Sequence, residues 1–431
     1  MSLDSNYTIK EINELCEINS SNYSKKDNWD FINYLDTKNI IKGEINEIKL
    51  FDPNYDKVPS RAKRKVKIDD IIISTVRPNQ EHYGMIKNKI DNFLVSTGFT
   101  TLTVDKTQAY PEFIYYYITQ KYITESLQTI AEQSTTSYPS IKPSDIGNLL
   151  IELPPLEIQE KISKILTSIE NKITVNKEIN KNLTNSITLL FKNWFVDFNF
   201  LNENNKPYKI DNGKMKNSEL GLIPNDWDIG ILGDYIKIER GLSYKGKYLS
   251  DEGIPLINLG NILPNSKFRL EKLKFYSGDF DEKYVVNAGD IVANTDLTQD
   301  RLVLGSPIIV PSLIDNDVII YSHHINRLSQ FKLPKFYIFY NLLSERYNHM
   351  VSGYATGTTV LAISKESLYD YRIIIPPKEL LFQFEEIATN IEKIKDNNLL
   401  EIEKLTKLRD TLLPKLMSGE IDVSKINCDL E

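Results

Sequence analysis

The sequence predicts an α+β protein, with two mixed α/β globular regions in an internal repeat that are separated by two long antiparallel coiled-coil helices. Three observations lead to this prediction. A segment that begins at Pro154 recurs at Pro376 without a gap, both copies carry an apolar residue at almost every seventh position, and about 150 residues of mixed pattern precede each copy.

An internal repeat divides the sequence into two similar halves. Residues 154–190 and 376–412 are identical at eleven of thirty-seven positions. Weaker matches pair "TTSYPSI" (135–141) with "GTTVLAI" (357–363), and "YTIKEINELCEI" (7–18) with "WDIGILGDYIKI" (227–238). A period this long excludes a solenoid, and two copies indicate pseudo-twofold symmetry within one chain. The predicted segments are a first globular region 1–153, a first long helix 154–198, a linker and second globular region 199–375, and a second long helix with a C-terminal tail 376–431.

The two helices follow from their periodicity. A seven-residue repeat predicts a coiled-coil seam, which the two helices bury against each other by packing antiparallel. Each copy opens with two prolines, which suit the first turn of a helix. From Gln159 to Phe191 the first helix spans ~50 Å. The seam residues are Ile162, Ile169, Asn176, Leu183 and Leu190 in the first copy, and Phe384, Ile391, Asn398, Leu405 and Leu412 in the second. The intervening apolar positions are Ile165, Ile173, Ile179, Ile187, Ile387, Ile394 and Leu408.

Two asparagines, Asn176 and Asn398, occupy the same seam position. They are either ordinary polar residues or a device that fixes the register of the two helices, as a lone buried asparagine does in some coiled coils. Because Asn176 lies near the midpoint of its helix, the second hypothesis predicts that the two side chains meet.

Composition narrows the class of protein. The chain has 431 residues, a net charge of −7, 41% hydrophobic residues and only two cysteines, Cys16 and Cys428. This excludes a disulfide framework and is typical of a soluble globular protein. No apolar run reaches membrane-spanning length and the first residues do not resemble a signal peptide, so we expect a cytoplasmic protein without membrane contact. The acidic balance leaves room for a local basic patch that binds DNA.

The layout resembles the specificity (S) subunit of type I restriction-modification systems across essentially the whole chain. The stretches "LPPLEIQEKISKIL" (153–166), "LRDTLLPKLMSGEI" (408–421) and "GLIPNDWDIGILGDYIKI" (221–238) carry the resemblance. Shorter stretches such as "STVRP", "VSTGF" and "ANTDLTQ" are similar to sequences of the family's recognition domains. One departure is that Leu381 stands where Gln159 aligns, with Gln383 nearby, which affects the expected contacts at that end of the helix.

The resemblance implies a non-catalytic subunit that binds double-stranded DNA. Each globular region would be a target-recognition domain that reads one half of a split target, and the helices would bind two copies of a methyltransferase subunit. Restriction subunits would join the full complex. No cofactor is expected on this chain, whereas S-adenosylmethionine, ATP and Mg would act on partner subunits, which would methylate adenine at N6 and cleave DNA.

In the first half, the segment "KVPSRAKRKVK" (57–67) has six basic residues and no acidic one, and a predicted strand and turn follow it. Lysine and arginine neutralise phosphates, and arginine reads guanine through two parallel hydrogen bonds. The alternative is an ordinary solvated loop. The predicted DNA-binding residues here are Arg61, Lys63, Arg64, Lys65 and Arg77.

In the second half, "ANTDLTQ" (293–299) places hydrogen-bonding side chains in a predicted turn, which is also common for purely local reasons. The adjacent histidines of "YSHHINRL" are expected to face opposite ways on a strand, one in the core and one, His323, at the DNA surface. The matched loops before the helices keep hydroxyl residues in both copies. The predicted DNA-binding residues of these segments are Asn294, Thr295, Thr298, Gln299, His323, Thr136, Ser137, Tyr138, Thr358 and Thr359.

Other motifs are incomplete. "GLSYKGKY" (241–248) has the glycine spacing of a phosphate-binding loop, but Tyr248 replaces the Ser or Thr that holds magnesium. Lys245 and Lys247 of this segment remain predicted DNA contacts. With two cysteines and four histidines, no zinc site is expected. Two further hypotheses remain: an enzyme that methylates or cuts DNA alone, and a DNA-binding scaffold or regulator that dimerises through its coiled coil.

Overall fold

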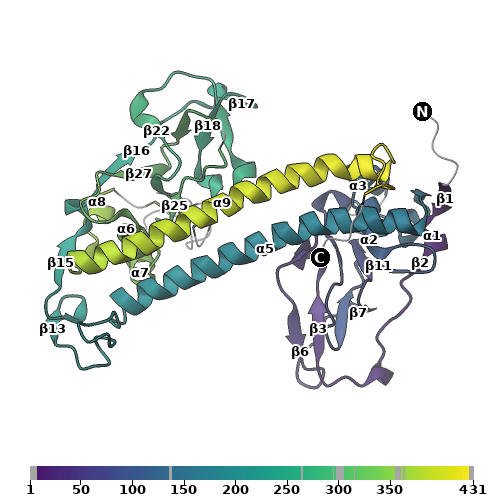
Figure 1. Ribbon diagram of the computed structural model, residues 1–431, viewed down its shortest axis with the longest axis horizontal. Helices are drawn as coiled ribbons and strands as arrows, with labels where there is room; N and C mark the ends of the chain where they lie inside the picture. Colours follow the sequence, from purple (N-terminus) through teal and green to yellow (C-terminus); the bar gives the residue numbers. More distant parts are fainter. Residues whose placement is uncertain are drawn as a thin grey trace. The chain divides into compact units, whose positions relative to one another are not determined.

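The computed structural model describes residues 7–134, 138–263, 266–294, 296–297, 305–314, 316–354, 361–362 and 365–426. The chain divides into two compact units. The first unit comprises Met1–Ile173 and Leu405–Glu431, and the second comprises Thr174–Lys404. Each unit therefore contains part of each long helix, α5 (Leu156–Phe195) and α9 (Lys378–Met417), which are the teal and yellow helices of Figure 1.

Both long helices begin directly after a proline pair. The carbonyl of Pro155 accepts hydrogen bonds from the backbone N–H groups of Ile158 and Gln159, at 2.9 and 3.1 Å. The carbonyl of Pro377 accepts one from Leu381 at 3.2 Å. The second proline of each pair therefore stands directly before the first turn and is not part of it. Its carbonyl accepts the first backbone hydrogen bonds of the helix. Each helix has 40 residues and is ~60 Å long, longer than the sequence predicted.

The predicted antiparallel helix pair is confirmed within each unit. In the first unit, Ile162 and Leu166 of α5 share a hydrophobic cluster with Leu416 and Met417 of α9. In the second unit, the rings of Phe191 of α5 and Phe384 of α9 lie 5.7 Å apart. The start of α5 therefore packs with the end of α9, and the end of α5 with the start of α9, as Figure 1 shows.

Burial along the seam is uneven. Ile179, Ile387, Ile394 and Leu408 are 37–46% exposed, contrary to the expectation that these apolar positions are buried. A straight helix drifts by ~20° per heptad from a seven-residue repeat, so some positions rotate away from the partner helix. Of the remaining residues, Ile162, Ile169, Asn176, Phe384, Ile173 and Ile187 are buried, and Leu183, Leu190, Ile391, Asn398, Leu405, Leu412 and Ile165 are half-buried.

The two seam asparagines bond to the opposite helix, but to different partners. Asn176 is 1% exposed and its Nδ2 donates to Oε2 of Glu401 at 2.8 Å. Nδ2 of Asn398 donates to Oδ1 of Asn180 at 2.8 Å, and Nδ2 of Asn180 donates to the carbonyl of Lys395 at 3.0 Å. The register hypothesis remains a prediction, whereas the expected meeting of Asn176 with Asn398 is replaced by these bonds.

The first unit has two four-stranded sheets, ordered β6-β3-β10-β7 and β2-β11-β8-β9, and a two-stranded ladder of β1 with β12. Strands β8 and β10 each consist of three apolar residues followed by a serine, and every residue of both strands is buried. The strands are β1 (Thr8–Glu11), β2 (Cys16–Ile18), β3 (Ile32–Leu35), β4 (Ile40–Ile41), β5 (Glu44–Ile45), β6 (Lys49–Phe51), β7 (Ala62–Lys65), β8 (Ile71–Ser74), β9 (Tyr83–Met85), β10 (Phe93–Ser96), β11 (Phe99–Val104) and β12 (Leu150–Leu153). The helices are α1 (Ile12–Leu15), α2 (Pro111–Ile118), α3 (Lys121–Glu132) and α4 (Pro143–Gly147).

The second unit repeats this plan, with sheets ordered β16-β27-β23-β25 and β17-β21-β18-β26-β22. The predicted linker 199–224 is structured in part, because it forms a hairpin and stacks Phe200 on Trp227 at 5.1 Å. The strands are β13 (Met215–Ser218), β14 (Gly221–Pro224), β15 (Asp228–Ile231), β16 (Lys237–Arg240), β17 (Leu249–Ser250), β18 (Ile254–Ile257), β19 (Ile262–Leu263), β20 (Lys267–Phe268), β21 (Lys274–Tyr276), β22 (Val285–Val286), β23 (Ile291–Asn294), β24 (Asp296–Leu297), β25 (Pro307–Ile309), β26 (Ile319–Tyr321), β27 (Ile325–Ser329), β28 (Leu361–Ala362) and β29 (Arg372–Ile375). The helices are α6 (Lys335–Leu342), α7 (Glu345–Tyr354) and α8 (Lys365–Tyr369).

The two units match in register as well as in element order. The β1–β12 ladder pairs Thr8 with Leu153, and the β15–β29 ladder pairs Asp228 with Ile375, so offsets of 220 and 222 residues superimpose one ladder on the other. Each unit also places one parallel pair inside an otherwise antiparallel sheet, β3 with β10 and β18 with β26. The internal repeat in the sequence is therefore a repeat of the fold.

A long-helix side chain caps a shorter helix in both units, but from different positions. In the first unit, Oε1 of Gln159 accepts from the backbone N–H of Tyr110, which precedes α2, at 2.9 Å. In the second unit, Leu381 aligns with Gln159, and Oε2 of Glu385 accepts from Phe336 in the first turn of α6 at 2.9 Å. The departure at Leu381 is thus accompanied by an acceptor one turn later in the helix.

Gln159→Ala is expected to destabilise the first unit by about 2–3 kcal/mol. Gln159 is 1% exposed, and its Nε2 also donates to the carbonyl of Pro154 at 2.7 Å, so alanine leaves a buried donor and a buried acceptor unsatisfied. Hydrogen exchange of α2 and β12 would measure the loss. The matched control is Gln383→Ala, because Gln383 is exposed on α9. Equal hydrogen-exchange protection of α2 and β12 in the two variants would contradict the capping role of Gln159.

Glu385→Gln is expected to raise the melting temperature increasingly as pH rises. Burial raises the pKa of Glu385, and the Phe336 N–H opposes this only in part. A carboxyl whose pKa is higher in the folded state costs stability as pH rises through the interval between its unfolded and folded pKa. Glutamine avoids this cost. Thermal melts of the wild type and the variant from pH 4 to pH 8 measure this effect. A difference in melting temperature that does not change with pH would refute the prediction.

Candidate nucleic-acid interface

Backbone hydrogen bonds join four loops of the first unit into one edge, which we call the first rim. The N–H of Thr97 donates to the carbonyl of Arg61 at 2.8 Å, and the N–H of Thr75 donates to the carbonyl of Gly98 at 2.8 Å. On the other side, a bridge pairs Val76 with Ser140. The first rim consists of Arg61, Thr97, Gly98, Thr75–Arg77 and 138–141.

Three of the predicted DNA-binding residues lie on the first rim. Arg61 and Arg77 are exposed, and the guanidinium carbon of Arg77 lies 5.1 Å from the centre of the Tyr138 ring. Tyr138 is itself 60% exposed. Thr136 and Ser137 lie outside the described residues. The rim thus presents two arginines and an aromatic ring, which are suited to phosphates and bases.

The middle of the basic segment 57–67 forms strand β7 (Ala62–Lys65), while the residues on both sides of it lie in loops. Lys63 is exposed, whereas the half-buried Arg64 donates from Nε to the carbonyl of Phe99 at 3.1 Å. Burial lowers the pKa of Arg64. Lys65 forms an ion pair with Asp27, and its ammonium lies 5.5 Å from the Trp29 ring. Of these three residues, Lys63 is therefore the most accessible to DNA, while Arg64 and Lys65 bind within their own domain.

An equivalent edge, the second rim, exists in the second unit. Strand β24 pairs Asp296 with Ala362 of β28, at offsets of 220 and 222 residues from the Val76–Ser140 bridge. Strand β23, which precedes β24 in the chain, pairs Asn294 with Ile325 directly after the β26–β27 turn, and Asn326 pairs with Arg240 at the start of the segment 240–244. The N–H of His323 donates to the carbonyl of Leu242 at 2.9 Å. A Cβ on Gly241 would collide with the carbonyl of Ser322, so the close approach of these two backbone segments requires glycine at position 241.

The two histidines of the second rim do not face opposite ways, and that prediction was wrong. His323 and His324 form the turn between β26 and β27, where strand alternation does not apply, and their ring centres are 3.9 Å apart. Both are half-buried. Nε of Arg240 donates to the carbonyl of His323 at 3.0 Å, and the Tyr244 ring lies 6.0 Å from the His323 ring. Within the described residues no cluster of three potential metal ligands occurs.

Comparison with known proteins decides the family. The family model for the type I restriction modification DNA specificity domain matches residues 4–185 and 224–409, which is most of the chain. The chain belongs to this family. It is accordingly a DNA specificity subunit of the type I restriction-modification class, and the two matched ranges correspond to its two repeated halves.

Individual specificity subunits match over nearly their whole length. The type I restriction enzyme HindI specificity subunit of Haemophilus influenzae is 25% identical over 460 residues, covering 93% of this chain and 97% of the relative. The MjaIX specificity subunit of Methanocaldococcus jannaschii is 26% identical over 439 residues, covering 97% and 93%. The solved type I restriction-modification S subunit from M. genitalium has a TM-score of 0.57 at 16% identity, covering 96% and 98%, and supports the fold.

The remaining predicted contacts of this specificity subunit are less completely described. Lys245 and Lys247 are exposed, and the Lys247 ammonium lies 4.7 Å from the Tyr248 ring. Asn294 ends strand β23 instead of lying in a turn, because it pairs with Ile325 of β27. The predicted residues outside the described ranges are Thr295, Thr298, Gln299, Thr358 and Thr359.

Sequence reasoning missed two residues of the second rim, Arg240 and Tyr244. The Lys274 ammonium lies 6.0 Å from the Tyr244 ring, so this edge combines basic and aromatic side chains as the first rim does. The signal was present in "RGLSYKGKY", where basic and aromatic residues alternate around a glycine. The sequence predicted DNA contacts in this segment at Lys245 and Lys247 but not at Arg240 and Tyr244.

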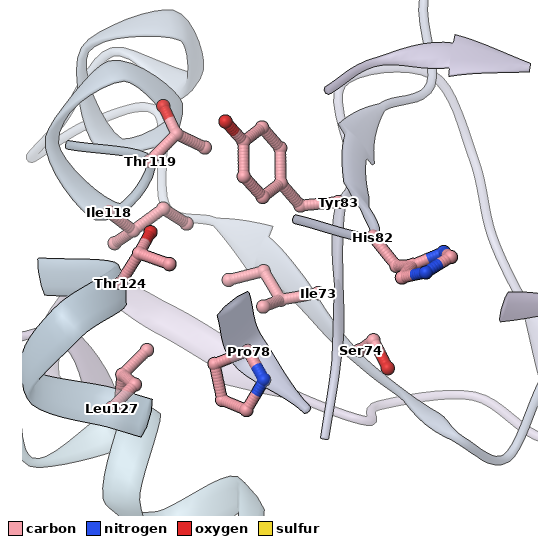
Figure 2. Close-up of a pocket in the computed structure, with 9 residues that line it drawn as sticks. All are labelled: Ile73, Ser74, Pro78, His82, Tyr83, Ile118, Thr119, Thr124 and Leu127. Carbon is pink, nitrogen blue, oxygen red and sulfur yellow. The ribbon is translucent and has the colours of Figure 1, made fainter. Parts of the chain in front are cut away.

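A small hollow in the first unit of the specificity subunit lies between β8, β9 and the helices α2 and α3 (Figure 2). Tyr83 points toward Thr119 and Ile118 (Figure 2), and burial raises the pKa of Tyr83, so its hydroxyl stays protonated at neutral pH. The lining is apolar apart from hydroxyls and His82, whose Nδ1 contacts the carbonyl of Thr37. These residues fit a packing gap better than a catalytic pocket.

The helices that the structure describes differ from membrane-spanning segments. In the described part of the chain, none combines the length and the apolar character needed to cross a bilayer.

Proposed function

We propose that the chain is the sequence-specific DNA-binding subunit of a type I restriction-modification complex, in which each unit reads one half of a bipartite double-stranded target. The observation that carries this proposal is the duplicated rim. The Val76–Ser140 and Asp296–Ala362 pairs give both units the same backbone frame, while the side chains around the frames differ. Two units with the same backbone pairing but different side chains around it are suited to reading two different half-targets.

The long helices are proposed to bind two copies of a methyltransferase subunit. The exposed apolar residues Val175, Ile179, Ile387 and Ile394 support this, because 37–46% of each side chain remains available to a partner. Restriction subunits would join this assembly in the cytoplasm. S-adenosylmethionine, ATP and Mg would be held by the partners, which would carry the adenine methylation and cleavage. A regulator that merely dimerises through its helices is less favoured, since the helices already pair within one chain.

Co-expression with a methyltransferase subunit tests the proposal. N6-methyladenine mapped across the host genome should lie in one sequence motif made of two separated parts. The methyltransferase expressed alone should give no such motif. A continuous motif, or methylation by this chain without its partner, would contradict the proposed function.

Removing the exposed charges of the first half should weaken DNA binding with little dependence on sequence. The double variant Arg61→Ala, Lys63→Ala is expected to reduce the slope of log K against log salt by about 1.8, because each phosphate contact contributes about 0.9. The charge-matched control is Lys89→Ala with Lys106→Ala, since these lysines pair with Asp91 and Asp69. Salt titrations of the methyltransferase complex that give equal slopes for all three proteins would refute the two contacts.

A further inference from the structure

We propose that Arg77 and Tyr138 form a base-reading pair in which Arg77 binds guanine in the major groove and Tyr138 holds the guanidinium in place. This assigns the pair a role in specificity rather than in general DNA affinity. It rests on the proposed function, because it requires that the first unit reads one half of the target.

The backbone around the pair is fixed from two sides. The N–H of Arg77 donates to the carbonyl of Pro139 at 3.0 Å, and the N–H of Ile141 donates to the carbonyl of Thr75 at 2.9 Å. Together with the Val76–Ser140 bridge, these bonds tie the end of β8 to the loop that carries Tyr138. The two side chains therefore start from a common, hydrogen-bonded frame although they are 61 residues apart in sequence.

Arg77 has a backbone conformation that arginine rarely adopts. Its φ of 49° and ψ of 70° lie in the left-handed region, where a residue larger than glycine or asparagine is strained. The bond to Pro139 and a second bond, from the N–H of Gln80 to the Arg77 carbonyl at 2.9 Å, hold it there. Strain of this kind is retained where a side chain must point in one direction, which is the requirement for reading a base.

The chemistry of the pair favours a base over a phosphate. A guanidinium donates two parallel hydrogen bonds from two nitrogens to O6 and N7 of guanine, whereas a lysine reaches these acceptors only from its single ammonium nitrogen. The Tyr138 ring, 5.1 Å from the guanidinium carbon, restricts the plane of that fork. Both side chains are exposed, so the donors are accessible to a base edge. A phosphate contact would carry no information on the base, and a lysine could also provide it as a point charge.

The second unit keeps the frame and changes the side chain. Leu297 occupies the position of Arg77 at the offset of 220 residues, and its strand β24 pairs with β28 as residue 76 pairs with residue 140. A conserved frame with a substituted side chain is typical of a position that selects different bases in two copies. We therefore expect guanine at the corresponding position of the first half-target only.

The test uses the specificity subunit in complex with its methyltransferase. Affinity for a duplex carrying the mapped wild-type motif is compared with affinity for duplexes changed at single bases. Arg77→Ala and Arg77→Lys should each lower discrimination at one guanine of one half-target by about 10- to 100-fold, with discrimination in the other half unchanged. Tyr138→Phe should behave as wild type, and Tyr138→Ala should lose discrimination several-fold at the same base.

Other outcomes overturn the inference. If Arg77→Ala weakens binding to all duplexes equally and lowers the salt dependence, Arg77 contacts phosphate only. If Arg77→Lys keeps wild-type discrimination, the planar fork held by Tyr138 is not what reads the base. Unchanged discrimination excludes any base contact. A wild-type complex without a bipartite motif would instead refute the proposed function, before any variant is made. Retained readout of the other half-target shows that the variants are folded.

Discussion

Phe384→Ala is expected to lower the free energy of unfolding of the second unit by about 3–5 kcal/mol. Phe384 is fully buried at the start of α9, and its ring lies 5.2 Å from Phe195, 5.7 Å from Phe191 and 5.7 Å from Tyr340. Alanine removes the contacts that join α9 to α5 and α6 at once. Since domains are stable by only about 5–15 kcal/mol, we expect a large loss of folded protein.

The same helix provides the control for this variant. Phe382 is two residues away and 63% exposed, so Phe382→Ala should change stability by less than about 0.5 kcal/mol. Urea unfolding followed through Trp227, which belongs to the same cluster, measures both variants. Similar midpoints for the two would show that the aromatic cluster does not hold the helices together.

Arg409→Glu is expected to separate the helices at the other end of the pair, at a cost of about 2–4 kcal/mol to the first unit. Nη1 of Arg409 donates to Oε1 of Glu170 at 2.6 Å, and Nη2 donates to Asp410 at 2.7 Å. Burial lowers the pKa of Arg409, but the two carboxylates outweigh it and raise the pKa. The variant places a third carboxylate in this partly buried cluster.

Exchanging the charges should recover much of the loss. The double variant Glu170→Arg, Arg409→Glu restores an opposite-charge pair between α5 and α9. Lys415→Glu is the control, since its pair with Glu420 is exposed on both sides and contributes little. Thermal melts and co-purification of the methyltransferase subunit measure the result. A swap that is no more stable than Arg409→Glu would show that the interhelical ion pair is unimportant.

The helix pair was predictable because its signal is local and repeated. Pro154 and Pro376 mark the starts, and the heptad positions show which face packs. The prediction overestimated the burial of Ile394 and Leu408. A heptad pattern identifies the apolar face of a helix, but it does not show how much of that face a neighbouring element covers. That depends on the rest of each unit, which has no comparable periodicity.

For the first rim, the sequence predicted which residues could contact DNA but not which of them lie together in the structure. The sequence identified Arg61, Arg77 and Tyr138 separately, but nothing in it showed that Tyr138 stacks on Arg77, because that contact depends on a backbone bridge. Arg64 has the same charge as Lys63, yet it turns inward to the Phe99 carbonyl. Strand alternation in β7 fixes this difference, and the sequence predicted a strand only after this segment.

The division of the chain has a consequence for its gene. The second unit is one unbroken stretch, Thr174–Lys404, and includes its share of both long helices. Two recombination breakpoints, near the codons of these residues, therefore replace a complete half-target reader with its hydrophobic core intact. Both breakpoints would fall inside the similar stretches 154–190 and 376–412. An exchange of this stretch would therefore change one unit as a whole, without a series of point substitutions.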